Sequence, residues 1–337
     1  MGPDGRGLYG LASRCAAAER AAAGSIRPDT GAPARIPRIG RVRHPRMLHL
    51  DNAGNRRIGI ALVTATTLMF ATLDTTAKWL VQELPVFQVV WLRFATHVLI
   101  MSALLAPVHG RELVRVRNVP LQALRALMLG VMTALNFWAL QHLQLAETGA
   151  IQFSVPLLIA LLSAWWLGER LGPQRWLAIA AGLVGVLLVV RPGTAAFHPA
   201  ILLSIGNAFL YATFNMLTRR LAATESAASM QLMSAIGAAV IIAPFGLAHW
   251  QWPAGPGTWA LIALCGVCGG FGHYLVAQAH RYASAATLGP FLYQQIVYMT
   301  LGGWLVFGQV PDALVVAGAG VVVLSGLYLL WHEVRGR

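Results

Sequence analysis

The sequence predicts an all-α integral membrane protein with ten transmembrane helices, arranged as two inverted five-helix repeats. Three observations predict it: the composition, the spacing of the apolar runs, and a similarity between the two halves of the chain. Of the 337 residues, 57% are hydrophobic and 11% are charged, whereas a soluble domain has about 25% charged residues. Such a chain has too little polar surface for a water-soluble fold. A soluble enzyme, a disordered scaffold and a secreted disulfide protein are therefore excluded.

The N-terminal segment differs in composition from the rest. Residues 1–57 hold eleven arginines against four acidic side chains and lack a sustained apolar period. We expect a disordered basic tail in the cytoplasm, able to touch anionic membrane lipid. Met47 lies just ahead of the first apolar run, and the sequence leaves open whether translation begins there. The net charge of +13 does not indicate nucleic-acid binding, because the other basic residues are dispersed between apolar runs.

The apolar runs follow one another closely along the chain. A membrane-spanning helix needs about 20 mostly apolar residues, and ten runs meet this requirement. The gaps between them are mostly short, so consecutive helices are expected to be antiparallel neighbours. The ten predicted spans are 58–80, 86–108, 127–145, 147–167, 175–191, 199–219, 226–249, 257–279, 285–308 and 312–332.

Basic residues recur in every second gap between these spans. The gaps that alternate with them hold Glu83, Glu147 and Asp312, with Arg191 as the basic exception. Because basic residues favour the cytoplasmic side, both termini are predicted to be cytoplasmic, in a bacterial inner membrane. The arginines on the predicted cytoplasmic side are Arg56, Arg57, Arg111, Arg115, Arg117, Arg125, Arg170, Arg175, Arg219, Arg220, Arg281, Arg335 and Arg337.

The two halves of the chain resemble each other. FATLDTTAKWL at Phe70–Leu80 lies 141 residues before YATFNMLTRRL at Tyr211–Leu221. Two homologous five-helix repeats are therefore predicted over 58–192 and 199–332. Because five is an odd number, the second repeat enters the membrane from the opposite face. Inverted repeats are typical of transporters that alternate access to a site near the bilayer midplane.

One stretch carries a resemblance to a known family. Ala139–Leu171 has a small-residue turn, an apolar helix interrupted by Pro156, and a terminal glycine followed by Glu169. It resembles the third and fourth helices of the EamA-type repeat of the drug/metabolite transporter superfamily. The second half follows the pattern more loosely, with Pro290 displaced and Gln309 where glutamate is usual. The resemblance implies ten helices, cytoplasmic termini and transport of small metabolites, often by efflux.

These features predict a secondary transporter, by efflux or exchange, of amino acids or their derivatives, with vitamin- or nucleoside-like compounds left open. The alternatives are an integral-membrane lipid-modifying enzyme and a non-transporting receptor. The enzyme would need acids, histidines or cysteines clustered at one membrane face, and the sequence shows no such cluster, so no catalytic residue is predicted. Cys265 and Cys268 form a lone CxxC in a glycine-rich run, which favours helix packing over metal binding. No cofactor, metal or nucleic acid is expected, and a homodimer is left open.

The first two predicted spans hold three charged residues, in a place where charge is costly. Asp74 and Arg93 lie about 9 Å and 10 Å from the outer face, from 1.5 Å per residue, and Arg93 also resembles the family pattern. Lys78 is one helical turn from Asp74. One hypothesis is a static network in which the three neutralise one another. The other is a substrate or proton site that competes for one partner. The first is slightly favoured.

Polar residues in other spans are further candidates. Gln294 and Tyr298 lie four apart on one helical face near the midplane, and Gln152 lies at similar depth in the fourth span. Amides and hydroxyls suit a zwitterionic or heteroaromatic metabolite, although they also form hydrogen bonds between helices. Asn215, which aligns with Asp74, is expected to cap or bond a neighbouring helix, with substrate contact as the alternative. Weaker candidates are Asn136, His97, His273 and Tyr274.

Overall fold

The computed structural model describes residues 53–167, 172–222 and 224–335, and these contain helices and no strand. Most of the predicted tail, Met47 and the motif at Glu169 lie outside the described residues. The first helix already begins at Ala53, within the segment predicted as tail. The helices are α2 (Ala53–Glu83), α3 (Val86–His109), η1 (Gly110–Val114), α4 (Val119–His142), α5 (Leu145–Gln152), α6 (Val155–Leu167), α7 (Pro173–Val190), α8 (Ile201–Leu221), α9 (Ala227–Ala248), α10 (Pro256–Tyr282), α11 (Ala285–Leu292), α12 (Gln294–Phe307) and α13 (Ala313–Arg335).

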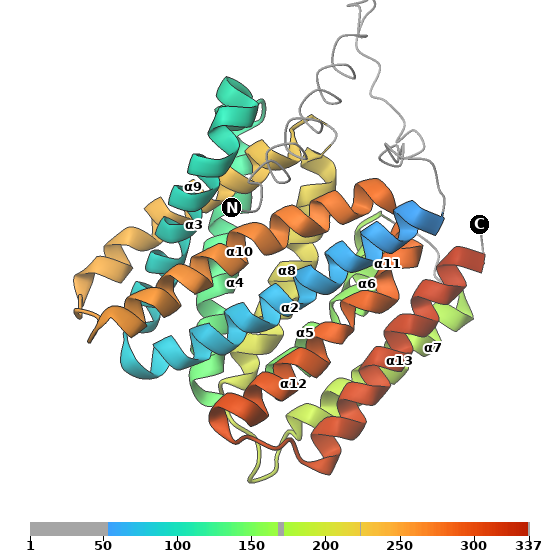
Figure 1. The fold of residues 1–337 in the computed structure, drawn as a ribbon. Helices are drawn as coiled ribbons and strands as arrows, with labels where there is room; N and C mark the ends of the chain where they lie inside the picture. The colour runs from blue at the N-terminus through green and yellow to red at the C-terminus, as the bar shows by residue number, and fades with distance from the viewer. Residues whose placement is uncertain (1–52, 168–171, 223, 336–337) are drawn as a thin grey trace, which may run out of the picture.

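The helices form a bundle in which the two halves of the chain interleave. α2 packs between α10 and α12, α13 packs on α7, and α3 packs on α9 (Figure 1). α4 packs on both α8 and α9. Each of these contacts joins a helix of the first half to one of the second half. The centre of the bundle is therefore built jointly by both halves.

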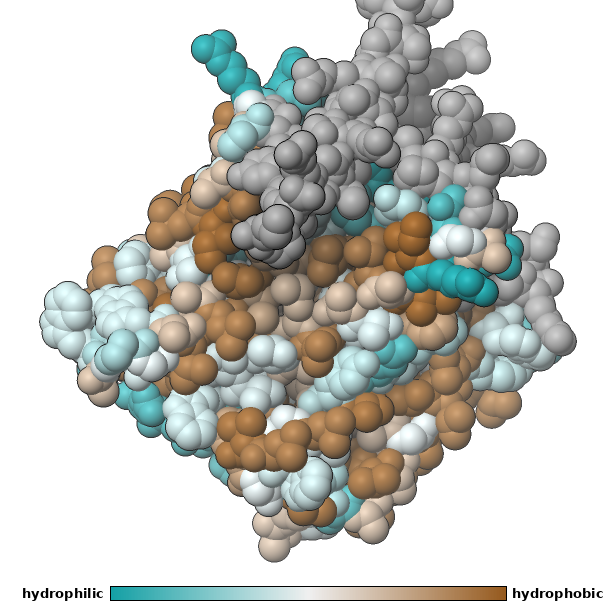
Figure 2. All heavy atoms as spheres, in the orientation of Figure 1, coloured by the Kyte–Doolittle hydropathy of each residue, from teal (hydrophilic) through white to brown (hydrophobic). Residues whose placement is uncertain are grey.

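The outer surface of the bundle is apolar. Brown and pale side chains cover most of the face in Figure 2, and large side chains such as Trp165 and Leu305 are largely exposed. Exposed apolar side chains are expected where lipid, rather than water, surrounds the protein. Nine segments of the described helices, with α5 and α6 counted together as one, are long and apolar enough to cross a membrane. The structure is that of a multi-pass membrane protein.

The fourth and ninth predicted spans are each broken into two helices. The breaks lie at Phe153 and Ser154 between α5 and α6, and at Tyr293 between α11 and α12. Pro156 accounts for the first, because it lacks the N–H that an unbroken helix would bond to the Gln152 carbonyl. Pro290 lies inside α11, three residues before the second break. Since α11 and α12 have 8 and 14 residues, neither reaches membrane-spanning length alone. The rings of Phe153 and Tyr293 lie 5.2 Å apart, so the two breaks face each other.

The third predicted span, 127–145, was placed too late in the sequence. Helix α4 runs from Val119 to His142. It begins there because the Asn118 side chain accepts a hydrogen bond from the backbone N–H of Leu121 at 3.2 Å, a capping contact that stabilises helix starts. Arg125, which was predicted to lie in a loop, is therefore inside the helix and buried.

The buried Arg125 is fully engaged by neighbouring helices. It donates to the Thr218 hydroxyl on α8 at 2.9 Å and to the Met230 carbonyl on α9 at 2.8 Å. A third bond reaches the Ser234 hydroxyl, and the guanidinium lies over the Phe214 ring. Neutral oxygens thus compensate a buried cation and join α4, α8 and α9.

The bundle has two ends, here called the Glu83 end and the Arg220 end after residues that lie there. At the Glu83 end, Gln88 and the Gln251 backbone exchange two hydrogen bonds, of 2.6 and 2.9 Å. Arg191 and Asp312 form an ion pair at the same end, which gives the exceptional loop arginine a partner. At the Arg220 end, η1 packs against α9.

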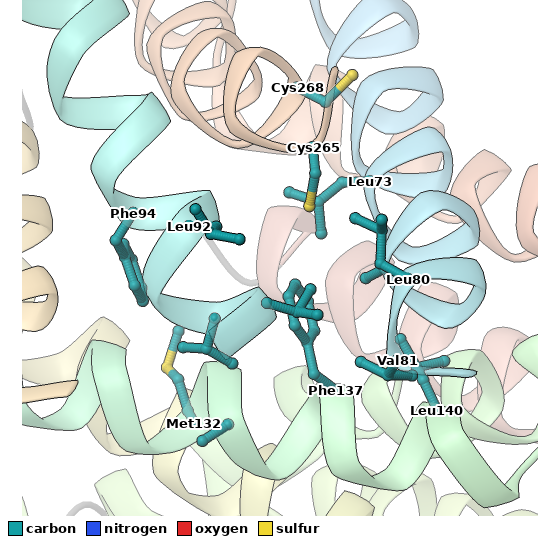
Figure 3. Close-up of a cluster of buried hydrophobic side chains, with 14 of the residues drawn as sticks. Leu73, Leu80, Val81, Leu92, Phe94, Met132, Phe137, Leu140, Cys265 and Cys268 are labelled. Carbon is teal, nitrogen blue, oxygen red and sulfur yellow. The ribbon is translucent and has the colours of Figure 1, made fainter. Parts of the chain in front are cut away.

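The main apolar core lies between α2, α3, α4 and α10 (Figure 3). Cys265 and Cys268 both belong to this core (Figure 3), and both are free and buried. A Cβ added to Gly266 or Gly270 would lie 2.5 Å from Thr96 or 2.8 Å from Met101. These glycines therefore allow α10 to approach α3 closely.

Candidate functional site

A cavity opens near the centre of the bundle, enclosed by helices from both halves. Its empty space, counting the open mouth, is about 700 Å³. The wall combines one acidic, one basic and several amide or hydroxyl side chains with apolar ones. The lining residues are Phe70, Leu73, Asp74, Arg93, Leu129, Met132, Thr133, Asn136, Phe137, Thr148, Gln152, Asn207, Tyr211, His273, Gln295 and Met299.

Asp74 is the acidic residue of this wall. It is buried on α2, and its Oδ1 accepts a hydrogen bond from the Asn136 side-chain amide on α4 at 3.0 Å. An amide donor stabilises a carboxylate without neutralising it. The Asp74 carboxylate can therefore still interact with a molecule that enters the cavity.

Arg93 is the basic residue of the wall, on α3. Its Nε and Nη1 atoms are buried and have no hydrogen-bond partner, and its guanidinium carbon lies 4.3 Å from the centre of the Phe94 ring. Among the described residues, no ion pair within 4.0 Å joins Arg93 to Asp74 or Lys78. The three charged residues therefore form no ion pair of this length with one another, although Asp74 and Arg93 attract each other through space.

Lys78 lies outside the cavity, at the Glu83 end. Its ammonium donates to the backbone carbonyls of Leu140 and Leu143, at 2.8 and 2.7 Å. These carbonyls belong to the last turn and cap of α4, where helix carbonyls lack internal donors and carry partial negative charge. Beside them, Gln82 donates to the Gln141 carbonyl at 3.0 Å. Lys78 thus fastens the end of α2 to the end of α4.

Gln152 and Asn215 differ in their positions. Gln152 lines the cavity at the end of α5, and its side-chain oxygen accepts from the Asn207 amide on α8 at 2.9 Å. Asn215 is not among the lining residues. Its amide donates to the Tyr211 carbonyl one turn earlier in the same helix, at 2.7 Å. The expected bond from Asn215 to a neighbouring helix is therefore replaced by one within α8.

Gln294 and Tyr298 share a helical face, as predicted, and bond to each other: the Tyr298 hydroxyl donates to the Gln294 side-chain oxygen at 3.2 Å. Neither lines the cavity, whereas the next residue, Gln295, does. Of the weaker candidates, Asn136 and His273 line the cavity. His97 and Tyr274 do not.

Thr133, Asn207 and Tyr211 are wall residues that the sequence reasoning missed. A signal for Tyr211 was present, because it aligns with Phe70 in the repeat and both line the cavity. Thr133 and the wall residue His273 lie 140 positions apart, close to the 141 that separate Phe70 from Tyr211. Among the described residues, no group of three or more His, Cys, Asp or Glu side chains that could hold a metal ion is found.

Known proteins share this architecture. The EamA-like transporter family matches residues 57–191 and again 198–331. A riboflavin transporter of Vibrio cholerae is 27% identical over 275 residues, covering 80% of this chain and 91% of the relative. An S-adenosylmethionine uptake transporter of Rickettsia felis is 26% identical over 263 residues, covering 77% and 88%.

A pseudopaline exporter of Pseudomonas aeruginosa is 25% identical over 272 residues, covering 80% of this chain and 95% of the relative. A solved crystal structure of a protein superimposes with a TM-score of 0.58 at 21% identity, covering 84% of this chain and 99% of the other. That structural likeness bears on the fold alone.

Proposed function

Because the chain belongs to the EamA-like transporter family, within the drug/metabolite transporter superfamily, we propose that it moves a small metabolite through the central cavity by alternating access. The protein is a membrane transporter and not an enzyme. We further propose that residues 58–192 and 199–332 form two inverted repeats. Transport is driven by a substrate or ion gradient, since the sequence carries no ATP-binding loop.

One observation carries this proposal: the two ends of the bundle are closed to different extents. At the Glu83 end, α2 and α4 pack together and Lys78 bonds the end of α4. The matching helices of the second half, α8 and α10, make at most marginal contact in the described part of the chain. Arg219, which aligns with Lys78, is exposed. In an inverted repeat, this difference is what one of two alternating states would show.

The broken helices also support transport through the central cavity. The break at Phe153 and the break at Tyr293 lie 140 positions apart, within one residue of the 141-residue offset between Phe70 and Tyr211. Discontinuous helices at matching positions of two halves are a recurring feature of transporter binding sites. Gln152 and Gln295, which flank the two breaks, both line the cavity.

We further propose that the Arg220 end faces the cytoplasm, in a bacterial inner membrane. Arg115, Arg117, Arg219 and Arg220 are all exposed at that end, and exposed arginines favour the cytoplasmic side. In this orientation the structure is closed to the outside. Bound lipid and a homodimer remain predictions from the sequence alone.

The substrate is proposed to be a compact polar metabolite: an amino acid or derivative, or a vitamin- or nucleoside-like compound. The relatives are named for riboflavin, S-adenosylmethionine and pseudopaline, and the cavity wall offers amides, a carboxylate and a guanidinium for such molecules. Since two relatives differ in being named for uptake and for export, the direction is left to experiment.

The test is transport by the purified chain in proteoliposomes, with labelled riboflavin, S-adenosylmethionine and the common amino acids. Thr133→Phe places a ring in the cavity and should abolish counterflow of the transported compound. Leu99→Phe adds the same ring at a lipid-exposed position and should leave it unchanged. Equal counterflow in both variants would contradict the assignment of the cavity as the transport site.

A further inference from the structure

Arg93 is a buried guanidinium whose hydrogen-bond acceptor is missing. It is 4% exposed, and its Nε and Nη1 atoms have no partner. Its guanidinium lies over the Phe94 ring, which offers no hydrogen-bond acceptor lone pair, and Asp74 attracts it through space without a hydrogen bond. Burying an unpaired charge strongly destabilises a folded protein. An arginine with unpaired donors on the wall of a cavity therefore indicates that an acceptor binds there from outside the protein.

Arg125 in the same bundle supplies an internal comparison. It is also 4% exposed, yet it bonds the oxygens of Thr218, Met230 and Ser234. The fold therefore can satisfy a buried arginine with neighbouring oxygens, and does so where the side chain is structural. At Arg93 it supplies none to the Nε and Nη1 atoms. The difference between the two arginines is that Arg93 lines the central cavity and Arg125 does not.

Space around Arg93 is provided by a neighbouring helix. A Cβ added to Gly269 on α10 would lie 2.9 Å from its Nη2, so a larger residue there would displace the guanidinium. The carboxylate on the same wall, Asp74, is held by Asn136 rather than by Arg93. The wall thus presents a cation and an anion that are not paired with each other.

We infer that Arg93 binds an anionic group of the transported molecule, a carboxylate or a phosphate, inside the cavity. A guanidinium matches such a group with two parallel N–H donors. Entry of the anion supplies the acceptors that the protein withholds. Asp74 and Asn136 then face the remaining polar part of the same molecule, so a zwitterion would satisfy both charges. The inference rests on the proposed transport function.

The first experiment does not depend on knowing the substrate. Thermal unfolding of the purified full chain is measured in chloride, acetate and inorganic phosphate at equal ionic strength. Acetate or phosphate should raise the melting temperature by about 2 °C through binding to the folded state. The rise should vanish in Arg93→Gln and persist in the control Arg220→Gln, which changes an exposed arginine. Acetate alone indicates a carboxylate site, and phosphate alone a phosphate site.

Two results would overturn the inference: no rise in the parent chain with either anion, or an equal rise in Arg93→Gln. If Arg93→Gln does not fold, Arg93→Lys replaces it. A lysine keeps the charge without the paired donors and should weaken the anion effect at least tenfold in apparent affinity. An undiminished effect in Arg93→Lys would also count against a guanidinium site.

Transport then separates this inference from the proposed function. S-adenosylmethionine and its decarboxylated form differ in a single carboxylate, and riboflavin and its phosphate ester differ in a single phosphate. Arg93→Gln should lose transport of whichever anionic member the parent chain carries. Transport of that anionic member at an unchanged rate in Arg93→Gln would refute the anion site and leave the transporter standing. If the parent chain transports nothing, the proposed function falls while the anion-binding result stands on its own.

Discussion

Lys78 offers the sharpest test of how the Glu83 end is closed. The change is Lys78→Met, which keeps an unbranched apolar side chain and removes the ammonium. In this structure the ammonium makes two bonds to carbonyls of α4, and a hydrogen bond from a charged group contributes about 1.5–3 kcal/mol. Their loss should favour separation of α2 and α4 by about 3 kcal/mol, a roughly hundredfold change in the population ratio.

The measurement is a distance between the outer ends of the two helices. Spin labels are placed at the exposed positions Glu83 on α2 and His142 on α4, in a chain whose cysteines are replaced. The parent chain should give predominantly one short distance. Lys78→Met should add a longer one as the major population. Lys78→Arg keeps a cationic donor and should retain the short distance, and Arg219→Met, at the opposite end, should not open the Glu83 end.

Identical distance distributions in the parent chain and Lys78→Met would refute this reasoning. In that case the packing of α2 on α4, with the bond between Gln82 and the Gln141 carbonyl, would suffice to hold the end closed. A Lys78→Arg variant as open as Lys78→Met would also count against capping, because it would show that the fit of lysine rather than its charge matters.

Three further predictions follow from named contacts. Asp74→Asn should abolish concentrative uptake but spare counterflow, since the neutral amide cannot exchange a proton or bind a cation as the carboxylate can; normal gradient-driven uptake in proteoliposomes would exclude a coupling role. The hydrogen bond from Arg191, followed by a backbone bond from Val315, lowers the pKa of Asp312 below its ordinary 3.8. The ion pair therefore contributes stability above that value that is lost as the pH falls through the lowered pKa, and melting temperatures of Asp312→Asn should lack this acid-dependent part. Gly270→Leu should lower stability by about 1–3 kcal/mol through overpacking, because its Cβ would lie 2.8 Å from a methionine, whereas Gly320→Leu meets open space and should melt as the parent does.

The number and order of the membrane helices could be predicted because a long apolar run has few other ways to fold in lipid. The start of α4 could not. A charged residue next to an apolar run usually indicates a loop, and Arg125 was therefore predicted to lie between two helices. It is tolerated inside α4 because Thr218 and Met230 supply oxygens, and these come from residues about a hundred positions away. Only the folded packing reveals such compensation.

The cavity wall was predicted in part. Asp74, Arg93 and Gln152 line it, since polar groups at mid-depth are stable only beside partners or a wet space. Gln294 was chosen for its spacing of four residues from Tyr298, which predicts a shared helical face but does not tell which face meets the cavity. Neighbouring residues on a helix point about 100° apart, at 3.6 residues per turn. An error of one residue is therefore enough to move a side chain off the wall.

The two halves align in sequence, but the basic residue at the Glu83 end differs in type and in burial from its match at the Arg220 end. Lys78 is buried against the carbonyls of Leu140 and Leu143, whereas Arg219 is exposed in the last turn of α8. At a separation of 140 residues, the carbonyls that match those of Leu140 and Leu143 belong to His280 and Ala283, at the end of α10, where helix carbonyls again lack internal donors. Under alternating access, closing the Arg220 end would bring Arg219 to these carbonyls, while Lys78 would lose its bonds to the carbonyls of α4.

Spin labels moved to the ends of α8 and α10 should then show a short distance that Arg219→Met abolishes. An unchanged distance would mean that a basic side chain caps helix carbonyls at the Glu83 end alone. Because an arginine and a lysine cap differ in donors and hydration, the two closed states need not be equally stable, which would give the transporter a preferred resting side.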